Sequence, residues 1–91
     1  MEVIGKVHSL GESITVSASY EKRELVVKTD EQYPQSILIE FPQGKCNDVL
    51  DTLSIGSNVK VGVNLVGREW VNPQGETKYF NSVKGWKIEK L

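Results

Sequence analysis

The sequence has very few residues suited to sulfur, imidazole or metal chemistry. It contains one cysteine, Cys46, and one histidine, His8, among 91 residues. A single cysteine excludes an internal disulfide and a cysteine-based zinc site. No Ser-His-Asp or Cys-His set can be built, because neither residue lies near a nucleophile motif. We therefore expect no catalytic site, no metal and no cofactor; a site made only of carboxylates is the alternative.

Long apolar runs are also missing. No segment approaches the roughly 18 apolar residues of a membrane span. The N-terminal stretch MEVIGKVHSLGE has no basic region followed by an apolar one, so we expect neither a membrane segment nor a signal peptide. With so little cysteine, the expected compartment is a reducing cytoplasm.

The chain as a whole is not basic, since its formal net charge is −1. Its charges are nevertheless segregated. Residues 1–59 carry five Lys or Arg and nine Asp or Glu, whereas residues 60–91 carry six and three, which gives net charges of −4 and +3. This asymmetry is a mild indication of an anionic partner. The length fits a single domain, residues 1–91, with a small core.

Hydrophobic periodicity predicts an almost entirely β structure. Residues 20–29 and 36–41 carry β-branched and aliphatic side chains between turn signals. In the stretch NVKVGVNLVG the apolar residues alternate with polar ones, which predicts one buried face formed by Val59, Val61, Val63 and Leu65. The expected strands are residues 1–7 with a short continuation at 14–16, then 20–29, 36–41, 58–67 and 78–89, the last with a break near Gly85.

One segment has a helical period instead. In GKCNDVLDTL, Cys46, Val49, Leu50 and Leu53 follow i, i+3, i+4, i+7 spacing, which predicts a helix of about three turns. Three strands, a short helix and two strands form the order of the OB-fold, a five-stranded Greek-key barrel. The expected fold class is therefore all-β, an OB-fold with its helix between strands 3 and 4. An SH3-like barrel is the alternative, which the helix disfavours.

The stretch REWVNPQGETKYFN, residues 68–81, places aromatic and basic residues around a turn. Pro and Gly in residues 72–75 predict a type I turn. Trp70 lies beside this turn and is the best candidate for an exposed ring; the alternative is that it packs across onto Tyr79. The two-residue period places Tyr79 and Phe80 on opposite faces. It also places Phe80 and Trp86 inside the barrel, where we expect Trp86 to act as a plug.

In an OB-fold, the face of strands 2 and 3 and the loops after strands 1 and 4 bind oligonucleotides or oligosaccharides. Tyr20 and Lys22 open the predicted strand 2 and would lie on that face. Arg68 and Lys78 lie on the predicted hairpin, where they can neutralise phosphates and make binding salt-dependent. Exposed rings can stack on bases, at roughly 1–3 kcal/mol per base and without sequence preference.

Two segments resemble a known family. They are KRELVVKTDEQYPQ, residues 22–35, and REW…KYFNSVKGWKIEK, residues 68–90. They are similar to a small bacterial and phage OB-fold family described only as a domain of unknown function, over nearly the full length. The resemblance implies similarity to single-stranded-DNA-binding proteins. It also implies the cytoplasm of a bacterial cell or of a phage-infected host.

A looser similarity links residues 53–79 to the bacterial single-stranded-DNA-binding protein family itself. It implies that Trp70 and Phe41 occupy base-stacking positions. For Phe41, which ends the predicted strand two residues after Ile39, the alternative is packing in the core on the same face as Ile37 and Ile39. The other stacking tryptophans of that family have no counterpart here, since Gln35 or Tyr33 stands at the position before strand 3. Its acidic tail also has no counterpart after Leu91, so we expect no recruitment of partners through a tail. Fewer rings imply weaker binding, or an oligomer that pools several copies.

The leading hypothesis is a non-enzymatic, sequence-tolerant module that binds single-stranded DNA in replication, recombination or repair. RNA is an alternative ligand, and a homo-oligomer, a dimer or larger, is expected. The alternative hypothesis is an OB-fold adaptor that binds protein and not nucleic acid, which the acidic pI favours. The predicted contact residues are Trp70, Tyr79 and Phe41 for stacking, Arg68, Lys78, Lys22 and Lys60 for the backbone, and Tyr20 on the strand face.

Overall fold

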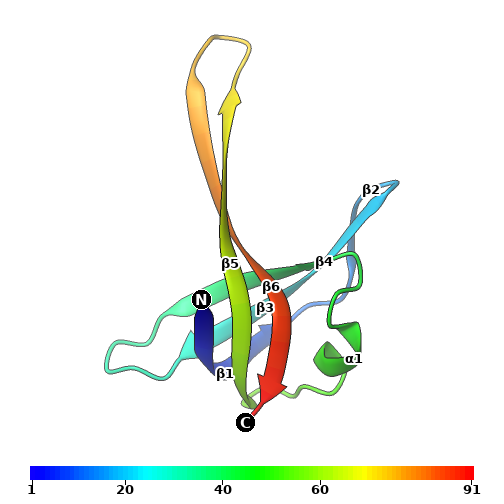
Figure 1. Cartoon of the computed structure of the whole chain (residues 1–91), viewed down its shortest axis with the longest axis vertical. Coiled ribbons are helices and arrows are strands. Elements are labelled where there is room, and N and C mark those ends of the chain that lie inside the picture. Colours follow the sequence, from blue (N-terminus) through cyan, green and yellow to red (C-terminus); the bar gives the residue numbers. More distant parts are fainter.

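The structure, a computed structural model, describes all 91 residues and is almost entirely β (Figure 1). Its elements follow the chain in this order: β1 Glu2–Leu10, β2 Ile14–Ser17, β3 Tyr20–Thr29, β4 Ser36–Pro42, α1 Asn47–Leu50, β5 Asn58–Val71 and β6 Thr77–Lys90. The expected all-β class is confirmed, and β3 has the predicted bounds. No helix is long and apolar enough to cross a membrane.

The strands form one sheet whose hydrogen bonding runs in a ring. Its order is β1-β5-β6-β4-β3-β2, and β1 also pairs with β3, so the ring returns to its first strand. All pairings are antiparallel except that of β4 with β6, which is parallel and short, at Ile39 with Val83 and Glu40 with Lys84. Because β1 and β2 both pair with β3, they act as two parts of one bent strand.

β5 and β6 extend beyond the ring as a two-stranded arm, which rises at the top of Figure 1. β1 pairs with β5 only as far as Gly62, and β4 pairs with β6 only at Val83 and Lys84. Residues 66–71 and 77–82 therefore pair only with each other. The predicted turn at the tip is confirmed by a hydrogen bond from the Gly75 N–H to the Asn72 carbonyl, at 2.9 Å.

The core lies inside the ring and is formed by eleven buried side chains. They are Val7, Leu25, Val27, Ile39, Phe41, Leu50, Leu53, Val59, Val61, Val63 and Ile88. Val59, Val61 and Val63 of β5 point inward as predicted. Leu65, predicted to continue their buried face, is instead 63% exposed. By that residue β5 has left the ring, so its inward face has nothing to pack against.

The helix is much shorter than predicted, four residues instead of about three turns. Cys46 precedes it with a left-handed backbone, φ 61°, so no helical turn can precede Asn47. After Leu50 the chain tightens, since the Thr52 and Leu53 N–H groups bond to carbonyls three residues back. Leu50 and Leu53 are nonetheless buried. The apolar stripe was correctly identified, and only its regular helical form was wrong.

Candidate nucleic-acid interface

The arm has two distinct faces, because neighbouring residues of a strand point to opposite sides and directly paired residues share a side. The pairs are Arg68 with Phe80, Glu69 with Tyr79, and Trp70 with Lys78. We call one side the basic face: Val66, Arg68, Trp70, Lys78, Phe80 and Ser82. The opposite face consists of Leu65, Gly67, Glu69, Val71, Thr77, Tyr79 and Asn81.

The basic face combines exposed rings with unpaired cations. Trp70 is 46% exposed and Phe80 is 49% exposed. The guanidinium carbon of Arg68 lies 5.9 Å from the centre of the Phe80 ring, within the range of a cation–π contact. Neither Arg68 nor Lys78 forms an ion pair, and no carboxylate lies on this face. This side of the arm is thus aromatic and positively charged.

Tyr79 does not belong to this group. It is 73% exposed but lies on the opposite face, across from Glu69. Trp70 pairs with Lys78, so the alternative in which Trp70 packs across onto Tyr79 is wrong. The prediction that Tyr79 and Phe80 point to opposite sides is confirmed. The prediction that Phe80 lines the core is wrong. The arm around Phe80 lies beyond the closed ring of strands, so neither face of the arm packs against the core.

Phe41 must be removed from the predicted stacking residues. Its side chain has no exposed surface and lies in the core. Its ring packs on Gly85 of β6, where any Cβ would collide with its Cε1 and Cζ atoms. A ring enclosed in this way cannot present a face to a base. The alternative noted from the sequence, packing with Ile39 in the core, is correct.

At the foot of the arm, Glu40 holds two lysines. Its carboxylate lies 3.4 Å from the ammonium of Lys22 and 2.5 Å from that of Lys84. Lys22 also lies 3.7 Å from Glu24. The hydrogen bond from Lys84 is the largest cause that lowers the pKa of Glu40, and the same bond raises the pKa of Lys84. Lys22 is therefore not a free cation, and the four charges of this group cancel.

Lys84 was missed by the sequence reasoning, although it lies in the predicted last strand. It borders a hollow of about 450 Å³ that joins the Glu40 group to the basic face of the arm. The residues lining this hollow are Glu40, Val66, Arg68, Phe80, Asn81, Ser82 and Lys84. Tyr20 opens β3 and is partly buried, and its proximity contributes to the raised pKa of Lys84. Tyr20 and Lys22 thus lie near the foot of the arm.

Lys60 lies away from this region. It pairs with Ile4 on one side and Glu89 on the other, and its ammonium lies 3.3 Å from the carboxylate of Glu2. Ten positions along β5 separate it from Trp70, which corresponds to about 33 Å at roughly 3.3 Å per residue. The structure does not bring Lys60 together with the arm residues.

Trp86 is also not where the sequence predicted it. Gly62 pairs with Lys87 and the next residue, Val63, pairs with Gly85, so Trp86 is the extra residue of a β-bulge. The bulge turns the indole away from the core. Its Cε2 atom lies 2.9 Å from where a Cβ on Gly62 would stand, and the side chain is 49% exposed. Trp86, which was expected to fill the interior, instead lies on the outer surface of the sheet.

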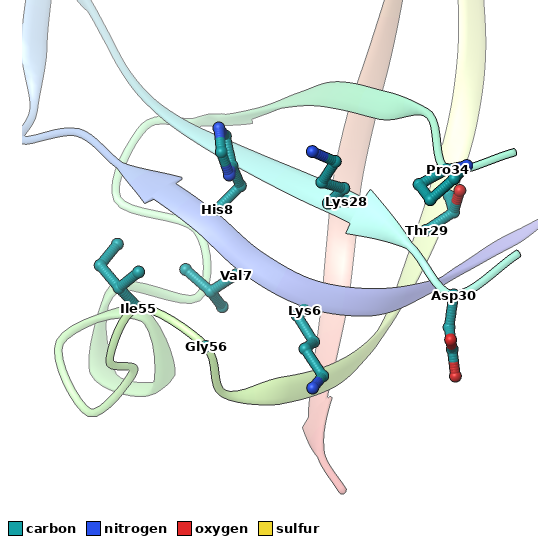
Figure 2. A pocket seen from close by; sticks show the side chains of 9 residues that line it. All are labelled: Lys6, Val7, His8, Lys28, Thr29, Asp30, Pro34, Ile55 and Gly56. Carbon is teal, nitrogen blue, oxygen red and sulfur yellow. The ribbon is translucent and has the colours of Figure 1, made fainter.

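A separate hollow of about 410 Å³ lies beside β1 and the end of β3 (Figure 2). Lys28 and His8 point to one side of the two strands, whereas Lys6 and Asp30 point to the other (Figure 2). Ligand pockets usually contain a few polar groups that converge. The polar groups here diverge, so the arm, and not this hollow, is the stronger candidate for a functional site.

Comparison with protein families assigns the chain. The model of a family described as Domain of unknown function (DUF3127) matches residues 2–89. The chain belongs to this family. The DUF3127 match starts at the first residue of β1 and ends one residue before the end of β6, so it includes both the ring and the arm. No curated protein matches the sequence significantly.

The DUF3127 match confirms one part of the expectation drawn from residues 22–35 and 68–90, a family of unknown function over nearly the full length. The relation of the DUF3127 domain to single-stranded-DNA-binding proteins stays a prediction.

Proposed function

We propose that this chain is an OB-fold module that binds single-stranded DNA with little sequence preference, in replication, recombination or repair. The fold part of the proposal is supported by strand order. With β1 and β2 counted as one bent strand, five strands remain, and α1 lies between the third and the fourth. That is the element order of an OB-fold.

One observation carries the binding part. Trp70 and Phe80 are both about half exposed on the basic face, beside Arg68 and Lys78, with no carboxylate among them. Rings that stack on bases next to cations that neutralise phosphates are what sequence-tolerant single-strand sites require. The contact set is accordingly revised from the sequence: Phe80 and Lys84 enter, whereas Phe41, Tyr79 and Lys60 leave.

A second candidate is favoured by the opposite face of the arm. Leu65, Val71 and Tyr79 are exposed there and Glu69 is the only charge, which suits a protein contact. This supports the alternative of a protein-binding adaptor. It also supports the expected homo-oligomer, since an isolated two-stranded hairpin is only marginally stable in water. The two faces allow DNA binding and self-association in the same molecule.

The test is a fluorescence titration with oligothymidine at low salt. A Trp86→Phe background leaves Trp70 as the only tryptophan, so its quench reports on the arm alone. We expect the quench to saturate with DNA and to weaken steeply with salt. In the wild-type chain, Trp70→Ala should weaken binding roughly 5- to 150-fold, which corresponds to losing 1–3 kcal/mol of stacking.

Tyr79→Ala is the matched control. It removes a ring that is more exposed than Trp70, 73% against 46%, from the same arm but from the opposite face, so it should leave DNA affinity unchanged. Equal losses from Trp70→Ala and Tyr79→Ala would count against the basic face as the site. Absence of any quench up to high micromolar oligothymidine would refute DNA binding. A Tyr79→Ala chain that becomes monomeric would support the opposite face as the contact between copies.

A further inference from the structure

Trp86 is a large apolar ring held on the surface by a backbone irregularity. The bulge at β6 inserts it between Lys87 and Gly85, which face consecutive residues of β5. In a regular strand it would share the inward direction of Ile88, which is buried. Its indole instead lies against Gly62, where a side chain would displace it. Bulges often redirect a side chain near functional sites.

The outer side of β5 connects Trp86 to the arm without interruption. The extra residue of the bulge is on β6, so the side chains of β5 still alternate regularly between the two sides of the sheet. Val61 and Val63 are buried, so Gly62 between them faces outward, and every second residue from Gly62 to Trp70 shares that side. The arm's basic face is therefore the distal end of a longer surface, which we call the β5–β6 strip.

The strip alternates rings with cations along its length. Trp86 lies over Gly62, Lys84 pairs with Asn64, Phe80 pairs with Arg68, and Lys78 pairs with Trp70. Eight positions of β5 separate Gly62 from Trp70, which gives a span of about 26 Å at roughly 3.3 Å per residue. A stacked single strand rises about 3.4 Å per nucleotide, so about eight nucleotides cover that span.

We propose that Trp86 is a second base-stacking site, and that one single strand runs lengthwise along the β5–β6 strip from the tip of the arm to Trp86. This rests on the proposed function. The proposal makes Trp86, which the two-residue period assigned to the core, a contact residue. It also gives the bound strand a direction and sets a minimum ligand length for full binding. About eight stacked nucleotides lies within the range of roughly 4–16 known for single OB-folds.

The prediction that follows is a dependence on ligand length. An oligothymidine of about three nucleotides covers roughly 10 Å when stacked and about 20 Å at twice that rise, so it cannot join Trp70 to Trp86. One of about twelve nucleotides can. Trp86→Ala should therefore weaken binding of the longer strand roughly 5- to 150-fold, and that of the shorter strand less than about twofold.

Two variants with a single tryptophan complete the test. Trp70→Phe leaves Trp86 as the reporter, and Trp86→Phe leaves Trp70; each substitution keeps an aromatic ring in place. With the longer strand both reporters should give the same dissociation constant, because one strand occupies both sites. Gly62→Ala is the check against a folding artefact. Its methyl group would displace the indole without removing it, and it should reproduce the length-dependent loss in a chain that still melts cooperatively.

The outcomes separate this inference from the function on which it rests. If Trp70 is quenched but Trp86→Ala binds the longer strand as tightly as wild type, the second site is refuted and the proposed function stands. Loss of affinity that is equal for short and long strands refutes the lengthwise path. If neither reporter responds to any oligothymidine, both proposals fall.

Discussion

Replacing Glu40 by glutamine should strengthen DNA binding and make it more sensitive to salt. In the folded chain Glu40 and Glu24 offset the charges of Lys22 and Lys84, so these four residues carry no net charge. Arg68 and Lys78, higher on the arm, form no ion pair. The strip thus has two free cations, Arg68 and Lys78, and a third cation, Lys84, whose charge is neutralised by Glu40.

The magnitude follows from counting these charges. For single strands the logarithm of the binding constant falls with the logarithm of salt concentration by about 0.7 for each phosphate neutralised. Two free cations therefore give a slope of about −1.4 for the wild-type chain. Glu40→Gln releases Lys84, while Lys22 keeps Glu24 at 3.7 Å. One added cation brings the slope to about −2.1.

The assay is a titration of one oligothymidine across a series of salt concentrations. Arg68→Gln should reduce the slope to about −0.7, since it removes one of the two free cations. Glu69→Gln is the matched control: it removes the same charge from the opposite face of the arm and should leave the slope near that of wild type. A wild-type slope near zero would refute the electrostatic part of the reasoning. Equal effects of Glu40→Gln and Glu69→Gln would mean that only net charge matters.

Three further predictions concern the fold. Phe41→Ala should cost about 3–5 kcal/mol in urea denaturation, because it empties the middle of the core; a stable variant with weakened DNA binding would restore Phe41 as a contact residue. Gly85→Ala forces a methyl group into the Phe41 ring and should cost about 1–3 kcal/mol, whereas Gly11→Ala, with only an ordinary 3.5 Å contact, is the control and should cost little. Finally, the pKa of Glu40 is lowered on folding, chiefly by Lys84, so its contribution to stability is present above the pKa of the unfolded chain and is lost as pH falls through the folded-state pKa. Urea denaturation at several pH values should show that Glu40→Gln loses less stability in acid than wild type, and an unchanged acid dependence would contradict this.

Much of the fold could be read from alternation alone. Residues 20–29 and 36–41 form strands at almost the predicted bounds, and the turn at residues 72–75 lies where Pro and Gly placed it. These predictions succeed because a two-residue period and turn residues act locally. The helix was overestimated for the same reason: its stripe of apolar residues is real, but spacing cannot distinguish a regular helix from a series of tight turns that bury the same side chains.

The candidate site was predicted only in part. Trp70, Arg68 and Lys78 were identified because they lie beside a recognisable turn, and the structure places them on one face. Phe41 was wrongly placed among the stacking residues, because similarity in sequence to a base-stacking position does not show whether the side chain is buried. Phe80 was assigned to the core on the two-residue period. That assignment holds only where one face of the strand packs against a core along its whole length, and the arm has no core beside it.

The amino-acid sequence by itself determines the strands, the turn at the tip of the arm and the basic character of the C-terminal third, since each depends on residues close together in sequence. Which rings are exposed was decided by contacts between distant segments. The ring of strands ends before the arm begins, which exposes Phe80, and one bulge opposite Gly62 turns Trp86 outward. A single extra residue reverses the direction of every side chain beyond it. Gly85 indicates a break in this strand, but only the pairing with β5 decides that Trp86 is the extra residue and points outward.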